Sequence, residues 1–555
     1  MTIPSNGTSS PNTQTTQGLT VLWCRQSWRM ADNALWAATN QYTETALLCV
    51  TSVAFETHAK YRRWSDSPRS IRWHRWGEAT AWYAHGSLTH FAQQLQSYQQ
   101  HLYFLKPFSS NEYAPPNTIT HTHDTCELIA LLEALTAEGT YVPRTVIVDE
   151  CNKPHARQSL RVLAEWCQRH DVQLRRFVTQ TMVSSHEVLN QQAQPFKVFS
   201  PFWKNLFQGL NSGQYRRRTL LPIPERLPPP PCKEVLTRVQ ATLATQASQH
   251  NSVWQLHTEI ASCALRPSFH TPQAAWDSAF TWQTGETAAL HTLQHFLNQG
   301  ATVYHQQRDY PSTSGTSKLS AALHFGEISP LQLWHAIETQ LQCPLSETQA
   351  LKNGHGMGTL LREVGWREFA YYLLYHFPDT TDAPLNPAFD TFPWEVNAEA
   401  LTRWQHGQTG YPMIDAGMRE LWATGWMHNR LRMMVASFLV KDLRIHWLEG
   451  ARWFWDTLVD ADLASNTLGW QWSAGCGADA APYFRVFNPI LQGKKFDASG
   501  EYVRRWVPEL KHVPLEHLHT PWTYGGVKGY PAPIVDHHEA RQFALEAFET
   551  IKRKS

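Results

Sequence analysis

The first part of the chain alternates short apolar runs with helical patterns. The apolar runs, each about the length of one strand, cover residues 19–24, 46–51, 102–105, 145–149 and 172–178. Between several of them, apolar residues recur every three or four positions, over residues 80–99, 127–137 and 156–169. This alternation is typical of a parallel sheet covered by helices. We predict a Rossmann-like α/β domain over residues 19–185, with a ligand site beyond the carboxyl ends of its strands.

The second part of the chain keeps a helical period and lacks strong strand signals. Its periodic segments cover residues 285–298, 329–342, 357–376, 411–424 and 428–447. We predict an all-helical domain over residues 271–545. Residues 186–270 are irregular and contain four consecutive prolines, which predicts an extended interdomain linker. The polar residues 1–18 are predicted to form a disordered tail.

Composition narrows the class of protein. The 555 residues include 48 Lys and Arg against 47 Asp and Glu, which excludes a uniformly basic DNA-coating protein but allows a local basic patch. The mean hydropathy of −0.43 and the lack of a long apolar run predict no membrane span. No secretory signal is recognisable at the start.

The cysteine and histidine patterns do not indicate a metal site. The nine cysteines are scattered without a CxxC pair, which argues against zinc or iron–sulfur ligation and fits a reducing compartment. His121 and His123 are expected in a solvated loop, so no metal is predicted.

Several clusters of chemistry-bearing residues lie in the helical part. At helical spacing Glu363, Trp366 and Arg367 share one face, either as part of a site or as a surface ion pair beside a packed Trp. Asn429, Arg432 and Met433 share another face, which would suit a flat polar ring or an ordinary amphipathic helix. Further polar and aromatic residues are dense between residues 460 and 472, and small hydroxyls that could cradle phosphate oxygens lie between 315 and 320.

Together these segments resemble the photolyase/cryptochrome flavoprotein family. The matching stretches read GTSKLSAALHFGEISP, EVGWREF, WQHGQTGYPMIDAGMRELWATGWMHNRLRMMVASFLVKDL and NTLGWQWSAGCGADAAPYFRVFNP. The resemblance runs from about Trp282 to Arg541, whereas the first half matches loosely.

The resemblance implies a helical domain that binds FAD. On matching positions the cofactor contacts would be Tyr304, Thr316, Ser317, Leu319, Ser320, Arg432, Asp460, Asp462 and Asn466. Arg432 would pair with Asp460 beside the isoalloxazine, and Asn466 would face flavin N5. A second, antenna pigment is also implied, and likeness to class III enzymes favours 5,10-methenyltetrahydrofolate over a deazaflavin or no antenna.

Within the family, the residues favour repair of cyclobutane pyrimidine dimers (CPDs). Enzymes for (6-4) photoproducts carry two histidines where this chain has Asn429 and Met433, and a thioether cannot replace imidazole in proton transfer. The residues that match a CPD pocket are Glu363, Trp366, Asn429, Arg430, Met433 and Trp472. The resemblance therefore implies a DNA lyase in which light drives electron transfer from reduced FAD to the dimer.

The partner implied by this reading is UV-damaged DNA containing a CPD. The arginines that match phosphate contacts are Arg308, Arg367, Arg430 and Arg485. We expect a monomer in the cytoplasm of a bacterium, associated with the nucleoid, or in the nucleus of a eukaryote.

Flavin reduction would use a tryptophan chain. Trp394, Trp447 and Trp470 match the family's electron-transfer triad, although most of the 25 tryptophans are expected only to pack. Two other functions stay open: a cryptochrome-type blue-light receptor without repair, and a flavin-free nucleic-acid binder that stacks bases on tryptophan. Asn466, where plant cryptochromes usually have Asp, favours repair.

Overall fold

The computed structural model describes residues 16–52, 76–107, 123–215, 219–250, 254–257, 280–345, 355–480, 482–483 and 485–552. Residues 1–15 of the predicted tail, and His121, lie outside the described residues. Gln17 and Gly18, which were assigned to the tail, belong to the first strand.

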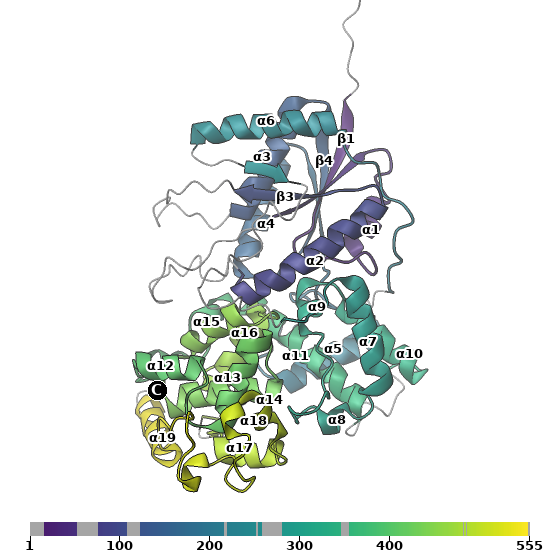
Figure 1. Ribbon diagram of the computed structural model, residues 1–555. Coiled ribbons are helices and arrows are strands. Elements are labelled where there is room, and N and C mark those ends of the chain that lie inside the picture. Colours follow the sequence, from purple (N-terminus) through teal and green to yellow (C-terminus); the bar gives the residue numbers. More distant parts are fainter. Residues whose placement is uncertain are drawn as a thin grey trace, which may run out of the picture.

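A six-stranded sheet forms the centre of the N-terminal domain (Figure 1). The strands are β1 (Gln17–Trp23), β2 (Ala46–Ser52), β3 (Leu102–Pro107), β4 (Tyr141–Asp149), β5 (Gln173–Phe177) and β6 (Trp254–His257). Their order is β5-β4-β1-β2-β3-β6, with β1 to β5 parallel and β6 antiparallel to β3. The predicted parallel α/β fold is confirmed, and β6 is an additional edge strand that the sequence analysis missed.

Helices cover this sheet and begin at recognisable signals. They are α1 (Ala34–Thr39), α2 (Glu78–Ser97), α3 (His123–Glu138) and α4 (Pro154–Arg169). The side chain of Asn33 caps α1 by accepting the Leu35 N–H, and Pro154 occupies the first turn of α4, where its missing N–H costs nothing.

The segment predicted as a linker contains two helices, which corrects that prediction. They are α5 (Phe199–Ser212) and α6 (Lys233–His250), while residues 219–232 between them are extended as expected from their prolines. Phe202 of α5 packs against Phe369 and Tyr372, with ring centroids 5.0 and 4.8 Å apart. The apolar face of α5 is thus completed by residues some 170 positions away, which the local pattern could not reveal.

The C-terminal part is helical, as predicted. Its α-helices are α7 (Glu286–Gln299), α8 (Tyr304–Gln307), α9 (Ser320–Phe325), α10 (Pro330–Leu341), α11 (Gly356–His376), α12 (Ala398–Gln405), α13 (Pro412–Thr424), α14 (Asn429–Ser437), α15 (Trp447–Thr457), α16 (Leu463–Ala474), α17 (Pro489–Phe496), α18 (Glu501–Trp506) and α19 (His537–Lys552). Short 3₁₀ helices cover Pro378–Thr381, Pro387–Thr391, Pro508–Leu510 and Pro521–Tyr524. The last helix passes the predicted boundary at residue 545.

The single helix predicted over residues 428–447 is wrong. The chain forms α14, then a π-helical turn over Phe438–Asp442, and starts α15 only at Trp447. Lys441 and Asp442 in that turn are buried and bonded to distant residues, Arg485 and His537. These tertiary bonds explain why the helical pattern is interrupted where the sequence gives no Pro or Gly.

The two domains are joined through a buried aromatic contact. Phe325 of α9 stacks between Trp28 and Tyr83, with ring centroids 5.2 and 5.3 Å away. At the carboxyl edge of the sheet, Asp149 accepts the backbone N–H groups of Arg25 and Gln26. The loop after β1 is thus bonded to the end of β4 and, through Trp28, contacts the helical domain. In the described part of the chain, no helix is long and apolar enough to cross a membrane.

Candidate active site

Two adjacent residues connect α8 to α11 and α14. Arg308, at the end of α8, donates a hydrogen bond from Nη1 to the Glu363 carboxylate on α11. Its neighbour Asp309 accepts from Arg430 Nη2 of α14 at 2.6 Å. Glu363 and Arg430 are 67 positions apart, and the two ion pairs bring α11 and α14 together. We call Arg308, Asp309, Glu363, Asn429, Arg430 and Met433 at this junction the rim. The Glu363 side chain keeps a third of its surface exposed, so it faces that rim rather than the core.

The first turn of α14 presents the remaining rim residues. Asn429 is exposed, and its Nδ2 lies 3.9 Å from the sulfur of Met433, one turn along the same face. Arg430 places its guanidinium 4.4 Å from the centre of the Phe496 ring on α17. His428 caps the helix by accepting the Arg430 N–H at Nδ1. Glu363, Asn429, Arg430 and Met433 were predicted to act together; the structure links Glu363 to Arg430 through Arg308 and Asp309, and places Asn429 beside Met433.

A second ion pair lies deeper. Arg432 Nη2 donates to both carboxylate oxygens of Asp460, at 3.1 and 2.8 Å, and its Nε donates to the Met427 carbonyl. Ser320 Oγ also donates to Asp460, at 2.5 Å. The Asp460 carboxylate is buried while Arg432 is half-buried, so the pair joins α14 to the start of α9 and exposes its positive side. The predicted Arg432–Asp460 pair is thus present.

The side chain of Asp462 is held by hydrogen bonds from three residues. Its side chain caps α16 by accepting the Ser465 N–H, and it also accepts from Tyr371 Oη at 2.8 Å and from His324 Nδ1 at 3.2 Å. Burial would raise the pKa of this carboxyl, but the hydrogen bond and charge of His324 hold it well below the usual range. Asp462 is therefore an ionised cap that fixes α16.

The exposed face of α16 carries Asn466 and Gly469, three residues apart. Asn466 Nδ2 donates to the Ala451 carbonyl of α15 at 2.9 Å, which orients the amide oxygen away from that helix. A Cβ atom at Gly469 would meet no atom within 4 Å, so the protein's own packing does not require glycine there. Trp472, also predicted for the pocket, lies half-buried on the same helix.

Arg367 is largely enclosed by the protein, unlike an arginine on a DNA-binding surface. Its guanidinium donates to the carbonyls of Gln180 and Leu323, at 2.6 and 3.1 Å, and its side chain is only 11% exposed. The structure contradicts the predicted phosphate contact and makes Arg367 a link between the domains. Trp366 stacks on Phe199 of α5, with centroids 3.8 Å apart and nearly parallel planes.

The segment before α9 holds the predicted hydroxyl cluster. Thr316 and Ser317 are half-buried, Ser320 is exposed, and Leu319 is buried. Tyr304 is buried under Arg308, whose guanidinium lies 5.3 Å from its ring. Burial first, and then the charge of Glu363, raises the pKa of Tyr304, so its hydroxyl stays protonated.

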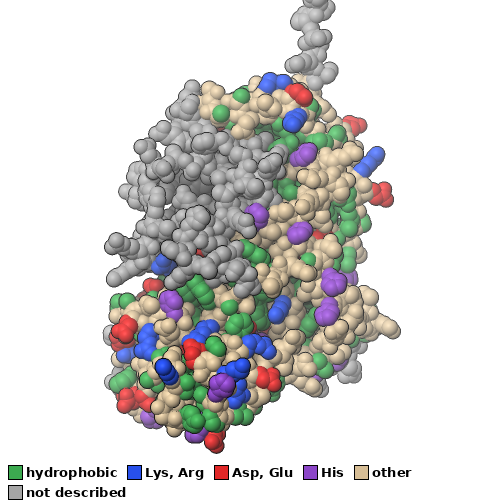
Figure 2. Space-filling view, viewed as in Figure 1, with side chains coloured by type: hydrophobic (Ala, Val, Ile, Leu, Met, Phe, Trp, Pro, Cys, Tyr) green, Lys and Arg blue, Asp and Glu red, His purple; other side chains and the backbone are tan. Residues whose placement is uncertain are grey.

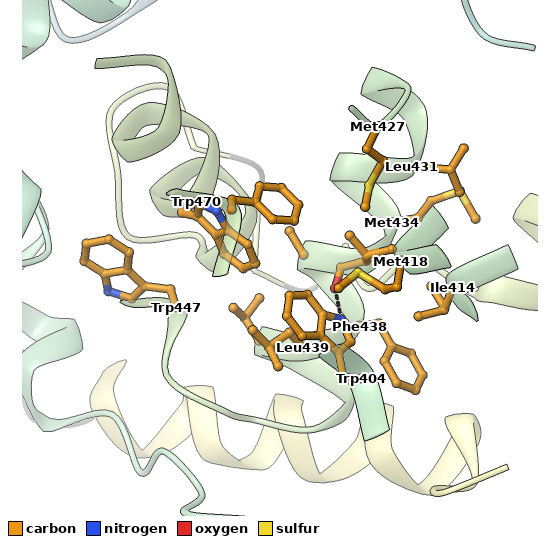
Figure 3. Close-up of a cluster of buried hydrophobic side chains, with 14 of the residues drawn as sticks. Trp404, Ile414, Met418, Met427, Leu431, Met434, Phe438, Leu439, Trp447 and Trp470 are labelled. Atoms are coloured by element: carbon orange, nitrogen blue, oxygen red, sulfur yellow. Dashed lines mark hydrogen bonds between the residues drawn. The ribbon is translucent and has the colours of Figure 1, made fainter. Parts of the chain in front are cut away.

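Of the three predicted electron-transfer tryptophans, two are buried and one is half-buried. Trp470 and Trp447 are buried within one cluster, drawn in Figure 3, and Trp394 is half-buried at its edge. A Cβ at Gly450 would lie 2.0 Å from the Trp470 ring, so α15 and α16 touch one turn after Trp447. The imidazole of His446 lies between the outer two, 5.0 Å from the Trp394 ring and 5.7 Å from the Trp447 ring.

Basic side chains gather on the C-terminal domain near these residues. Figure 2 shows Lys and Arg side chains over the part of the surface where α13, α17 and α18 lie. Arg485, just before α17, is exposed and thus available to a partner. Asp and Glu side chains lie among them in the same view, and the predicted DNA contacts stay a prediction.

Several contributing residues were missed from sequence. Tyr371 lies four residues after Arg367 on α11, so helical spacing could have indicated it. Asp309 adjoins Arg308, but nothing local indicates its partner Arg430. His324 gave no signal that distinguishes a buried ligand of Asp462 from a core histidine.

Comparison with known proteins agrees with this geometry. Residues 20–229 match the family model described as DNA photolyase, and residues 360–550 match the FAD binding domain of DNA photolyase. A deoxyribodipyrimidine photo-lyase of Agrobacterium fabrum is 38% identical over 419 residues, which are 74% of this chain and 80% of that protein. This chain belongs to the photolyase/cryptochrome family.

Other members of the family differ in their names. A solved bacterial class III photolyase from Agrobacterium tumefaciens is 31% identical, with a TM-score of 0.77 over 98% of this chain and 100% of that one. Cryptochrome-2 of Arabidopsis thaliana is 31% identical over 86% of this chain and 72% of its own length. Both photolyases and cryptochromes are therefore relatives.

The residues of the helical domain fit an FAD group. Arg432 offers positive charge next to a buried carboxylate, Asn466 offers an oriented amide oxygen, and Gly469 leaves room for close approach to α16. Hydroxyls of the 316–320 segment add hydrogen-bond donors of the kind that bind a pyrophosphate. The match to a photolyase FAD-binding domain over α11 to α19 agrees with this fit.

Proposed function

We propose that this protein is a deoxyribodipyrimidine photo-lyase that repairs CPDs in DNA under blue light. The observation that carries the proposal is the rim built by Arg308 and Asp309, which sets Glu363 opposite the first turn of α14. This rim offers a carboxylate, an amide and a thioether but no imidazole pair. Those groups suit a pyrimidine dimer, whose carbonyl and N–H edges need hydrogen bonds and whose methyl groups need apolar contact.

The proposed cofactor contacts are those of the sequence analysis. They are Tyr304, Thr316, Ser317, Leu319, Ser320, Arg432, Asp460, Asp462 and Asn466. When bound and reduced, FAD supplies a light-driven one-electron transfer that opens the cyclobutane ring and then reverses, without net redox change.

The protein's own residues would bind and orient the reactants. The Arg432–Asp460 pair would supply positive charge beside the ring system, and the Asn466 amide oxygen would accept an N–H. Beside its proposed cofactor contact, Asp462 would hold Ser465, Tyr371 and His324 in place, because its oxygens accept a hydrogen bond from each. Glu363 and Asn429 would bond the dimer edges, with Trp366, Met433 and Trp472 as apolar walls.

DNA binding would rest on arginines around the rim. Arg430 and Arg485 would contact phosphates beside the extruded dimer, and Arg308 would exchange part of its bond to Glu363 for a phosphate. Extrusion costs less for a CPD than for a normal base, because the dimer pairs weakly. We expect a monomer. Because its substrate is DNA, we expect the protein in a bacterial cytoplasm, or in a nucleus if the source is eukaryotic.

The proposed route for flavin reduction runs through Trp394, Trp447 and Trp470. Its support is the contact between α15 and α16 at Gly450 and the half-buried position of Trp394 at the edge of the cluster. An electron leaving Trp394 would cross to Trp447 and then to Trp470. An external thiol would restore Trp394.

The proposed antenna is 5,10-methenyltetrahydrofolate, which rests on likeness to class III photolyases. Extraction of the purified protein, with chromatography against folate and deazaflavin standards, tests this. Recovery of a deazaflavin, or of flavin alone, would reject it.

The deciding experiment for the function is a repair assay. Photoreduced protein is mixed with CPD-containing oligo(dT), and the return of thymine absorbance is followed under blue light and in the dark. We expect light-dependent recovery only with the damaged strand. No recovery with bound, reduced flavin would reject repair and leave the cryptochrome-type receptor, which a relative named Cryptochrome-2 represents.

A further inference from the structure

The end of α14 holds the backbone that carries Arg485. Ser437, the last residue of α14, accepts the Phe487 N–H at Oγ over 3.3 Å. Lys441, four residues later in the π-helical turn, donates from Nζ to the Arg485 carbonyl at 2.9 Å. One turn of helix thus anchors the segment on either side of Val486.

The Lys441 ammonium is buried, which is unusual for a lysine. The side chain is 1% exposed, and a buried ammonium is costly unless it is matched by acceptors or charge. Its surroundings are the Arg485 carbonyl, the Tyr483 ring at 5.3 Å and the neighbouring Asp442. Asp442 in turn is bonded to His537 Nδ1. The Lys441 ammonium thus donates to the Arg485 backbone, while Asp442 beside it is bonded to His537.

The start of α14 contacts the same region. Arg430 lies over the Phe496 ring at the end of α17. Asn488 caps the start of α17 by accepting the N–H groups of Ile490 and Leu491, each at 3.0 Å. The segment from Arg485 to Phe496 is thus fixed to α14 at both ends, by Ser437 and Lys441 at one and by Arg430 at the other.

We infer that Ser437 and Lys441 are positioning residues for DNA binding. They hold the Arg485 backbone so that its exposed guanidinium keeps a fixed distance from Arg430, matching phosphates on either side of a damaged site. The buried Lys441 ammonium thereby fixes the position of the exposed Arg485 guanidinium. This inference rests on the proposed function for its ligand, but the anchor itself is a property of the free protein.

The test compares Lys441→Met with wild type. Methionine keeps much of the length of the side chain and removes the charge and the donor. We expect affinity for a CPD duplex to fall about threefold to tenfold, and the salt dependence to become shallower by up to about one counterion, as one phosphate contact weakens. In the DNA-free protein, trypsin should cleave faster after Arg485. Lys233→Met, which removes an exposed lysine of α6, should leave both readouts unchanged.

A second variant keeps the test decisive. Ser437→Ala removes the other anchor with a minimal change of volume, and we expect the same direction in both readouts. If Lys441→Met does not accumulate as folded protein, Ser437→Ala alone provides the test. Wild-type salt dependence and wild-type cleavage in the folded variants would overturn the inference. Failure of wild type itself to prefer CPD DNA would instead reject the proposed function, while the cleavage rate would still report on the anchor.

Discussion

Arg308 donates a hydrogen bond to Glu363, and this contact fixes the carboxylate on which the proposed repair reaction depends. Because part of the Glu363 side chain is exposed, its carboxylate can turn from Arg308 to a ligand without passing through the core. Glu363→Ala should therefore retain flavin but repair more slowly, by about threefold to tenfold for the loss of one hydrogen bond. The measurement is repair per absorbed photon at saturating DNA.

Arg308→Ala serves as the matched variant for Glu363. It should weaken DNA binding and leave repair at saturating DNA near wild type, because Glu363 is then free to meet the dimer. Equal repair per photon in Glu363→Ala and wild type would remove this carboxylate from the reaction.

Variants of Arg430 and Arg367 distinguish the loss of a surface charge from the loss of an interdomain hydrogen bond. Arg430→Gln should weaken CPD-DNA affinity and lower the salt slope by about one, because one phosphate contact is lost. Arg367→Gln should lower the melting temperature and leave the salt slope unchanged, because its guanidinium bonds the Gln180 and Leu323 carbonyls. A reduced slope in Arg367→Gln would contradict the buried placement seen here.

Trp394→Phe tests the reduction route independently of repair. Phenylalanine keeps a ring but is much harder to oxidise, so bleaching of oxidised flavin under blue light with an external thiol should slow strongly. The same variant reduced with dithionite should repair CPDs at the wild-type rate, since that electron does not use the tryptophans. Wild-type bleaching would point to another route through this Trp-rich domain, and lost repair would make Trp394 structural.

Two glycines of the helical domain should respond oppositely to alanine. At Gly450 a Cβ would lie 2.0 Å from the Trp470 ring, so Gly450→Ala should destabilise the protein by about 1–3 kcal/mol. At Gly469 a Cβ meets nothing within 4 Å, so Gly469→Ala should leave apoprotein stability equal or higher. If flavin lies against α16, that second variant should still lose flavin affinity. Unchanged flavin content in Gly469→Ala would place the cofactor away from this face.

Glu420 should make stability fall as the pH rises from acid to neutral. Burial raises the pKa of this carboxyl from 4.5 to about 7, although Tyr502 Oη donates to it at 2.7 Å. A raised folded-state pKa means that the stabilising protonated form is fully present below pH 4.5 and lost as the pH rises through 7. The free energy of unfolding should decline by up to about 3 kcal/mol between pH 4.5 and 7 and change little from this group at higher pH.

Glu420→Gln mimics the protonated form and should flatten that decline in a melting series across pH. Glu399→Gln, on the exposed surface of α12, should keep the wild-type slope. An unchanged slope in Glu420→Gln would show that Glu420 is already ionised in the fold.

The order of the elements, and the residue types that could form the site, were predictable from the residues alone. Alternating and helical periods indicated β1 to β5 and most long helices, because strand and helix faces repeat within a few residues. The motifs indicated Glu363, Arg432 and Asp460, which the structure places in ion pairs, and Asn429, which lies beside Met433. These features depend on residue types and short spacings, which the chain carries locally.

The tertiary structure alone decided where distant residues meet. Helix α5 inside the expected linker is stabilised by packing against α11, and the helix predicted over residues 428–447 is broken where Lys441 bonds Arg485. Arg367 reads as a surface cation from its helix face but lies between two domains, bonded to carbonyls of each. Periodicity records how a residue relates to its neighbours along the chain, whereas burial and partners depend on elements more than 40 positions away.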